Sequence, residues 1–345
     1  LIDEEYKMME ISQLIQSGNY INEFKKHKVI FRKYPKLGLL IAKQKYGATY
    51  SEDIPWLNYC RGLVINYEKD EIVFLPPVKA REIQTYEEFS NLGDYRELID
   101  GTMINLFYTD RWMMATRSNI GCNNQWSAKL SFKQMFKECS LNFDYEALDK
   151  TCTYSFVMRH RSNRITTPIE TNQLYLVEMR RGLEVIEPVK SEFYNVVSSS
   201  DISHSLYKGL TCYQDGIRYK WLTNEHKFIE MIKPNTNNPH LDYLQLRSSG
   251  HLINYLKMFP EKRFEFDKYR NQLHNFTQAL YDYYRGVFVQ KEINKKDIPF
   301  SLKPFIYALH KEYLTTQQSI SYSRVKQYIY EQEPKKLLFA LNRLE

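Results

Sequence analysis

The chain is poor in cysteine, shows no metal-binding spacing of histidines and lacks any long apolar run. Five cysteines lie far apart in 345 residues with no Cys-x-x-Cys pair, so we expect neither a disulfide framework nor a zinc site, and a reducing compartment. The eight histidines include no spacing such as His-Glu-x-x-His. No apolar stretch approaches the length that spans a bilayer and no signal-peptide pattern is present, so we expect no membrane partner. The first residue is Leu1 rather than methionine, and we expect the numbering to start inside a longer gene product.

The rest of the composition is that of a folded protein. Apolar residues make up 43% of the chain and charged residues 26%, which argues against disorder. The length predicts two domains or one elaborated domain. A net charge of +7 is spread thinly, so it favours a nucleic-acid partner only weakly over a plain basic protein. The 28 tyrosines suit both sheet packing and base stacking, and packing is the more frequent use.

Strand patterns dominate the first part of the chain. Alternating apolar residues predict one hairpin over residues 62–75 and another over residues 103–117. The second hairpin directly follows an Asp100-Gly101-Thr102 turn. Further elements are expected after it: strands over 152–158, 174–179 and 183–186, a helix over 131–150, and a loop at Ser198-Ser199-Ser200.

From about residue 248 the alternation stops and apolar residues recur at intervals of three and four, which is typical of amphipathic helices. We expect a long helix over residues 269–287, a second after Pro299, a third capped by Ser321 or Ser323, and a last one that begins at Pro334. The predicted fold class is therefore α+β, with an antiparallel-sheet domain over residues 1–247 and an all-helical C-terminal domain over residues 248–345.

The Asp100-Gly101-Thr102 turn and its strand resemble motif I of the covalent nucleotidyltransferases, which are the RNA and DNA ligases and the mRNA capping enzymes. In that family the pattern is Lys-x-Asp-Gly, and the lysine attacks the α-phosphate of a nucleotide to form a covalent adduct. Here Leu98 occupies the lysine position, and leucine has no lone pair with which to attack. The resemblance therefore implies an antiparallel-sheet nucleotidyltransferase domain (an ATP-grasp-like ligase domain) without its nucleophile.

Other sequence blocks resemble those of phage-type RNA ligases in their order and in the strands on which they lie. The predicted helical C-terminal domain also resembles that of these ligases. Upstream of motif I, Arg61 begins a strand and Pro76-Pro77-Val78-Lys79 ends the next; after motif I, a turn contains Arg117. Motif III matches at Phe156 and at Asn163-Arg164-Ile165, but its glutamate is Val157.

The last two motifs are also only partly kept. Motif IV, Glu-Gly-x-Val, resembles Asp215-Gly216, with aspartate in place of glutamate. Motif V is a Lys-x-Lys pair on a strand, and residues 228–233 offer Met231 and Lys233. Degenerate sequences of this kind are similar to products of large DNA viruses.

The resemblance implies candidate site residues. Those expected to bind a nucleotide are Arg61, Lys79, Asp100, Gly101, Arg117, Asn163, Arg164, Asp215, Gly216 and Lys233. The dense arginine patch of Arg159, Arg161 and Arg164 is the candidate RNA contact, with simple surface charge as the alternative. Asp215 is the candidate metal ligand, and no catalytic residue is assigned, because position 98 is leucine.

Three functional hypotheses remain open. The first is a pseudo-ligase that binds RNA, a nucleotide or a protein partner without nucleotidyl transfer. The second is an active ATP-dependent RNA ligase with a relocated nucleophile, for which Lys79 is the nearest candidate, and which would need ATP and magnesium. The third is a structural component of a viral particle or complex. We expect a cytoplasmic or virion-associated location for all three.

Overall fold

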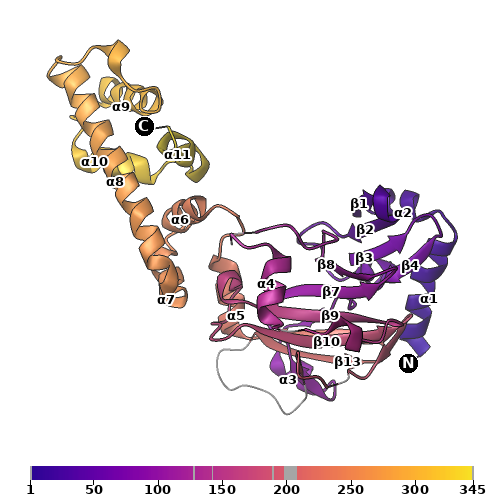
Figure 1. Cartoon of the computed structure of the whole chain (residues 1–345). Helices are drawn as coiled ribbons and strands as arrows, with labels where there is room; N and C mark the ends of the chain where they lie inside the picture. Colours follow the sequence, from indigo (N-terminus) through magenta and orange to yellow (C-terminus); the bar gives the residue numbers. More distant parts are fainter. Residues whose placement is uncertain (1, 127–128, 142, 189, 198–207, 344–345) are drawn as a thin grey trace. The chain divides into compact units, whose positions relative to one another are not determined.

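The computed structural model of the chain describes residues 2–126, 129–141, 143–188, 190–197 and 208–343 (Figure 1). It divides into two compact units, Leu1–Lys227 and Phe228–Glu345. The first contains mostly antiparallel sheets and the second is helical, which confirms the predicted antiparallel sheets and the helical C-terminal region. The division falls earlier than residue 247 because Ile229, Ile232 and Leu244 already pack into the helical core. The loop expected at Ser198-Ser199-Ser200 lies outside the described residues.

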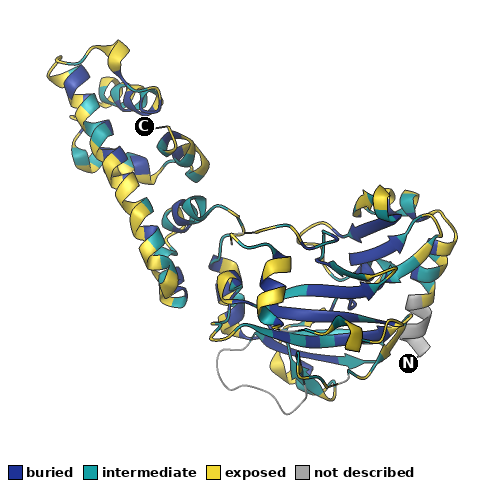
Figure 2. Ribbon diagram, viewed as in Figure 1, coloured by how far each residue is buried: buried dark blue, intermediate teal, exposed yellow. Residues whose placement is uncertain are grey.

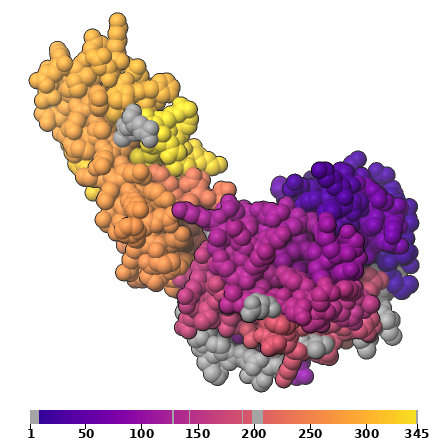
Figure 3. Space-filling model, in the orientation of Figure 1, coloured from indigo at the N-terminus to yellow at the C-terminus, as the bar shows by residue number. Residues whose placement is uncertain are grey.

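The first sheet of the N-terminal unit is antiparallel, with its strands in chain order. Two helices, α1 (Ile2–Gln16) and α2 (Tyr20–Lys26), pack their apolar side chains against it, and Ile15 and Phe24 are fully buried. In the space-filling view the N-terminal segment (indigo) joins the segment of β7 to β9 (magenta) in one continuous surface (Figure 3). The strands of this sheet are β1 (Ile30–Tyr34), β2 (Leu39–Lys43), β3 (Arg61–Asn66) and β4 (Glu71–Phe74).

The second sheet has six strands in the order β11-β10-β9-β7-β8, with β12 beside β10. Figure 2 shows its central strands largely buried, because α4 (Phe132–Cys139) packs against them. This helix begins at a capping box between Ser131 and Gln134 and ends earlier than the helix predicted over 131–150. The strands are β7 (Thr102–Tyr108), β8 (Trp112–Ala115), β9 (Cys152–Arg159), β10 (Gln173–Arg181), β11 (Glu184–Ile186) and β12 (Asn195–Val196).

The third sheet, in the order β5-β14-β13-β6, supplies much of the candidate site. A short helix, α3 (Tyr86–Ser90), packs Phe89 against it. The hairpin of β13 and β14 turns at Asp215 and Gly216, whose φ angles of 49° and 68° are both left-handed, as a two-residue hairpin turn requires. The strands are β5 (Arg81–Ile83), β6 (Tyr95–Glu97), β13 (Gly209–Gln214) and β14 (Ile217–Leu222).

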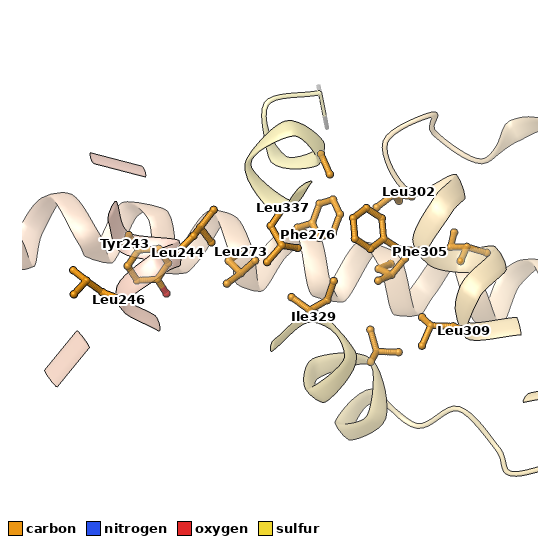
Figure 4. Close-up of a cluster of buried hydrophobic side chains, with 14 of the residues drawn as sticks. Tyr243, Leu244, Leu246, Leu273, Phe276, Leu302, Phe305, Leu309, Ile329 and Leu337 are labelled. Atoms are coloured by element: carbon orange, nitrogen blue, oxygen red, sulfur yellow. The ribbon is translucent and has the colours of Figure 1, made fainter. Parts of the chain in front are cut away.

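The helical unit is organised around its longest helix, α8, which contacts α6, α9, α10 and α11. Figure 4 shows part of its core, where Leu273 and Phe276 of α8 lie among side chains from the neighbouring helices. No helix in the described part of the chain is both long and apolar enough to cross a membrane. The helices are α5 (Asn224–Ile232), α6 (Pro239–Ser248), α7 (Leu252–Met258), α8 (Arg263–Tyr284), α9 (Lys303–Thr316), α10 (Tyr322–Tyr330) and α11 (Pro334–Leu341).

The strand expected for motif V over residues 228–233 is wrong: these residues lie in and just after α5. Ile229 and Ile232 are three residues apart and both are buried in the helical core. That spacing places them on one face of a helix, whereas in a strand they would point to opposite sides.

Candidate functional site

A cavity of about 810 Å³ in the N-terminal unit is lined by residues from all three sheets. Its charged lining is dominated by cations. The basic residues are Arg61, Lys79, Arg81, Arg96, Arg117, Lys208, Arg218 and Lys220, and the acidic ones are Glu52, Glu82 and Glu97. This excess of positive charge, rather than the net charge of the whole chain, makes the cavity a candidate anion site.

Five of these cations form no ion pair within the described residues. We call four of them, Arg61, Lys79, Arg117 and Arg218, the basic cluster, and the fifth is Arg96. Three other lining cations are paired: Arg81 with Glu52 at 2.9 Å, Lys220 with Glu82 at 2.8 Å, and Lys208 with Asp100 at 3.6 Å. Among the residues that the structure describes, no carboxylate therefore compensates the charge of the basic cluster at the cavity.

The members of the basic cluster are close enough to affect one another's protonation. Burial, together with the positive charges of Arg218 and Arg117, lowers the pKa of Arg61 to about 10, which still leaves Arg61 charged at neutral pH. Burial, followed by Arg61, Arg117 and Lys220, lowers the pKa of Lys79 to about 8. A bound anion would relieve this mutual repulsion, which is the electrostatic signature of a binding site rather than of a structural ion-pair network.

A close backbone approach at Gly62 brings two of these arginines to the same cavity. Gly62 has φ +108°, and a Cβ built there would lie 3.1 Å from Arg117 Cα. Only glycine readily allows this approach, which joins the start of β3 to the segment after β8. Arg117 is fixed further by donating from Nη2 to the Gln44 carbonyl oxygen at 3.0 Å.

Lys79 lies after β4 and is held by the loop that follows β2. Its ammonium group donates to the carbonyl oxygens of Ala48 and, at 2.9 Å, of Thr49. Arg218 in β14 donates to the Thr211 hydroxyl at 3.4 Å, and its guanidinium group lies 5.9 Å from the Tyr213 ring centroid. Both cations are therefore oriented by neutral groups, which leaves their charge available to a ligand.

One wall of the cavity is apolar, and it includes both positions where the ligase pattern requires reactive groups. Leu98 follows β6, and Val157 lies in β9 opposite Met103 of β7. The other apolar members of the wall are Ile99, Met103, Val177 and Val197. The structure thus brings the lysine position and the glutamate position of the pattern to the same cavity, each with a side chain that can neither attack nor coordinate.

Asp100 does not line this wall but anchors the chain behind it. It is buried, and its Oδ2 accepts hydrogen bonds from the backbone N–H groups of Thr166 at 2.8 Å and Thr167 at 2.9 Å, and from the Thr166 hydroxyl at 2.7 Å. Burial acts to raise the pKa of Asp100, but Lys208 and these hydrogen bonds outweigh it and lower the pKa below its ordinary value. Asp100 is therefore ionised and structural at neutral pH.

Gly101 and Asn163 hold the start of β7 against β9. A Cβ at Gly101 would lie 2.5 Å from the Met158 carbonyl oxygen, so glycine is required there. Asn163 donates from Nδ2 to the Thr102 hydroxyl at 2.8 Å and is buried. Of these two, Gly101 lines the cavity.

The three arginines predicted as RNA contacts do not line the cavity. Arg159 donates to the Pro168 carbonyl oxygen at 2.7 Å, Arg161 to that of Glu170 at 2.6 Å, and Arg164 to that of Thr166 at 3.1 Å. Each guanidinium group thus helps to hold the loop of residues 166–170. RNA binding by these arginines stays a prediction.

Three further candidates are not among the residues that line the cavity. Asp215 is exposed in the β13–β14 turn, next to Gly216. Lys233 belongs to the helical unit, where its ammonium nitrogen lies 5.5 Å from the Phe259 ring centroid. No group of three or more His, Cys, Asp or Glu side chains in the described residues is arranged to hold a metal ion, Asp215 included.

The sequence patterns missed the cations of the third sheet. Arg218 and Lys220 are two residues apart in β14, so they face the same side, as a Lys-x-Lys pair on a strand would. Lys208 directly precedes β13, which begins at Gly209. The Arg-x-Lys spacing just after the Asp-Gly turn was a usable signal, whereas Lys208 offered none.

Comparisons with known proteins give only distant likenesses among solved structures. No protein-family model and no curated protein matches the sequence. Among solved structures, the chain is similar to an inferred ATP-dependent DNA ligase from Aquifex aeolicus, with a TM-score of 0.40 and 15% sequence identity over 77% of this chain and 79% of that chain. A likeness this distant says nothing about what the present chain binds.

Proposed function

We propose that the N-terminal unit is a ligase-like domain whose cavity binds the phosphates of a nucleotide or of an RNA end without transferring a nucleotide. The observation that supports binding is the basic cluster, four cations without carboxylate partners in the described residues, on one cavity. The guanidinium group of arginine is well suited to phosphate, because it forms paired, charge-assisted hydrogen bonds with two phosphate oxygens.

The same cavity argues against nucleotidyl transfer by the family's route. That route needs an amine at position 98 to attack phosphorus, and a carboxylate at position 157 to place the ribose or a metal. Leu98 and Val157 stand there on the apolar wall. Binding energy from the basic cluster remains available, but the covalent intermediate cannot form at Leu98, and Val157 cannot place the ribose or a metal.

The first prediction is binding without covalent transfer. ATP and a 5′-phosphorylated RNA oligonucleotide should bind to the full chain. For the RNA, four phosphate contacts give an expected slope of log K against log salt of roughly −3. Titration calorimetry at several salt concentrations measures this slope. Intact-mass analysis after incubation with ATP and magnesium or manganese should show the unmodified chain. A nucleotide-sized mass increase would contradict the proposed absence of nucleotidyl transfer. Absence of binding at low salt would contradict the proposed phosphate binding.

A second candidate function is an active ligase that uses Lys79 as its nucleophile. The observation that favours it is the pKa of about 8, since roughly a tenth of the Lys79 amines are then uncharged and able to attack at pH 7. Lys79 also lines the same cavity as the basic cluster. Detection of a covalent nucleotide adduct on Lys79, or of a sealed RNA product, would support this function.

The second prediction separates the charge of Lys79 from its reactivity. Because protonated Lys79 binds an anion and neutral Lys79 does not, phosphate affinity should fall as pH rises through about 8. Lys79→Arg keeps the charge across this range, so its affinity should stay level from pH 7 to 9, whereas Lys79→Ala should be weak throughout. If the wild-type protein seals RNA and Lys79→Arg still does so at the same rate, Lys79 is not the nucleophile.

A further inference from the structure

The residues of the cavity do not fit the divalent metal that the ligase resemblance implies. Magnesium takes oxygen ligands in near-octahedral geometry, and in proteins these are usually one or two carboxylates together with water and substrate phosphates. Two of the lining carboxylates, Glu52 and Glu82, are already paired with cations, and the glutamate position is Val157. No metal-holding cluster of His, Cys, Asp or Glu side chains occurs among the described residues. The charged groups of the lining therefore fit an anion rather than a metal ion.

Lys208 instead places a fixed positive charge between a buried carboxylate and the cavity. Its ammonium nitrogen lies 3.6 Å from Asp100 Oδ1, and the lysine side chain is 22% exposed and lines the cavity, whereas Asp100 is 2% exposed. Asp100 Oδ1 accepts no hydrogen bond within the described residues. Lys208 is thus the counter-charge of Asp100. Its ammonium group has three N–H donors, which can be shared between Asp100 and a ligand.

We propose that Lys208 takes the place of a divalent metal, so that the cavity binds a free polyphosphate rather than its magnesium complex. This inference rests on the proposed function and names its ligand class. Eight cations and three carboxylates line the cavity, an excess of five positive charges. A free triphosphate has roughly four negative charges at neutral pH, and one bound magnesium ion removes two of them. The free form is the better match to the lining.

The test compares metal-free and metal-loaded ligand on the unmodified full chain. Inorganic tripolyphosphate and ATP are titrated calorimetrically at constant ionic strength, once with EDTA and once with excess magnesium. We expect binding in EDTA to be at least as tight as with magnesium, and roughly tenfold tighter for tripolyphosphate. Binding that requires magnesium overturns this inference but leaves the proposed function intact. Absence of binding in both conditions overturns the proposed function itself.

Variants at Lys208 test the residue directly. Lys208→Met should weaken tripolyphosphate binding in EDTA roughly tenfold, whereas Lys36→Met, which removes the same charge at an exposed position, should leave it unchanged. Lys208→Glu places a carboxylate opposite Asp100, so it should abolish binding in EDTA and make the remaining binding depend on magnesium. Circular dichroism establishes that each variant is folded. A folded Lys208→Met protein with wild-type affinity in EDTA overturns the inference.

Discussion

Replacement of Arg180 by alanine is expected to lower the free energy of unfolding of the N-terminal unit by about 3–5 kcal/mol. Arg180 and Glu178 are neighbours on one face of β10, with side chains 2% and 4% exposed, and Arg180 Nε lies 2.7 Å from Glu178 Oε1. Arg180 also donates to the Leu183 carbonyl oxygen at 2.8 Å. Its removal leaves the Glu178 charge buried without its main partner, which is far more costly than loss of a surface pair.

Arg181 offers a matched control one residue away. Its side chain is 59% exposed and pairs with Asp149, itself 40% exposed, at 3.1 Å. Arg181→Ala should therefore change the free energy of unfolding far less than Arg180→Ala, because solvent screens such pairs. Urea unfolding followed by circular dichroism measures both variants. A similar small loss for Arg180→Ala would show that the buried pair contributes little.

This buried pair also supports one side of the candidate site. Glu178 Oε2 accepts a hydrogen bond from the Tyr213 hydroxyl at 2.7 Å, and burial raises the pKa of Tyr213 well above its usual value, so the hydroxyl remains a donor. Tyr213 lines the cavity beside Arg218. A series of contacts runs from Arg180 through Glu178 and Tyr213 to Arg218. It explains how a charge buried in β10 can position a cation of the basic cluster.

Periodicity was enough to predict most of the helices and hairpins, but it failed where two patterns competed. The helices after residue 248 follow from apolar intervals of three and four, and α10 begins at the predicted Ser321 cap. Residues 228–233 were interpreted as a strand because the ligase pattern demands one there, although Ile229 and Ile232 have helical spacing. A short apolar run fits both the helical and the strand period, and the interpretation that followed the ligase motif was wrong.

The candidate site was only partly visible in the sequence. Arg61, Lys79 and Arg117 were predicted from separate blocks, and the structure brings them to one cavity. Arg218 and Lys220 could not be placed there without the pairing of β14 with β5 and β13, which depends on residues far apart in the chain. An Asp-Gly dipeptide between alternating strands is also a strong hairpin-turn signal, and Asp215-Gly216 forms such a turn.

The arginine patch illustrates a different limit. The density of Arg159, Arg161 and Arg164 in the sequence predicts a phosphate contact. Each also donates to a backbone carbonyl oxygen two or nine residues along the chain. Because any backbone offers such acceptors, composition cannot distinguish an arginine that binds a ligand from one that fixes its own loop.

Replacement of Arg61 by alanine should weaken the binding of ATP or tripolyphosphate about 10- to 100-fold, which corresponds to about 1.5–3 kcal/mol for a charge-assisted hydrogen bond. Arg61 begins β3 and lines the cavity, and no carboxylate of the described residues pairs with it. The exposed Arg111, in the turn between β7 and β8, provides a control of equal charge, and Arg111→Ala should leave the affinity unchanged. Titration calorimetry at one salt concentration compares the two variants.

The same substitution should have two further effects that a structural role would not produce. Arg61 is one of the charges that lower the pKa of Lys79, so Arg61→Ala should raise that pKa and shift the loss of ligand affinity to a pH above about 8. The free protein should also be at least as stable as the wild type, because the repulsion of Arg61 by Arg117 and Arg218 is removed. If Arg61→Ala instead lowers the melting temperature and leaves the affinity unchanged, Arg61 stabilises the sheet and the basic cluster is not the binding site.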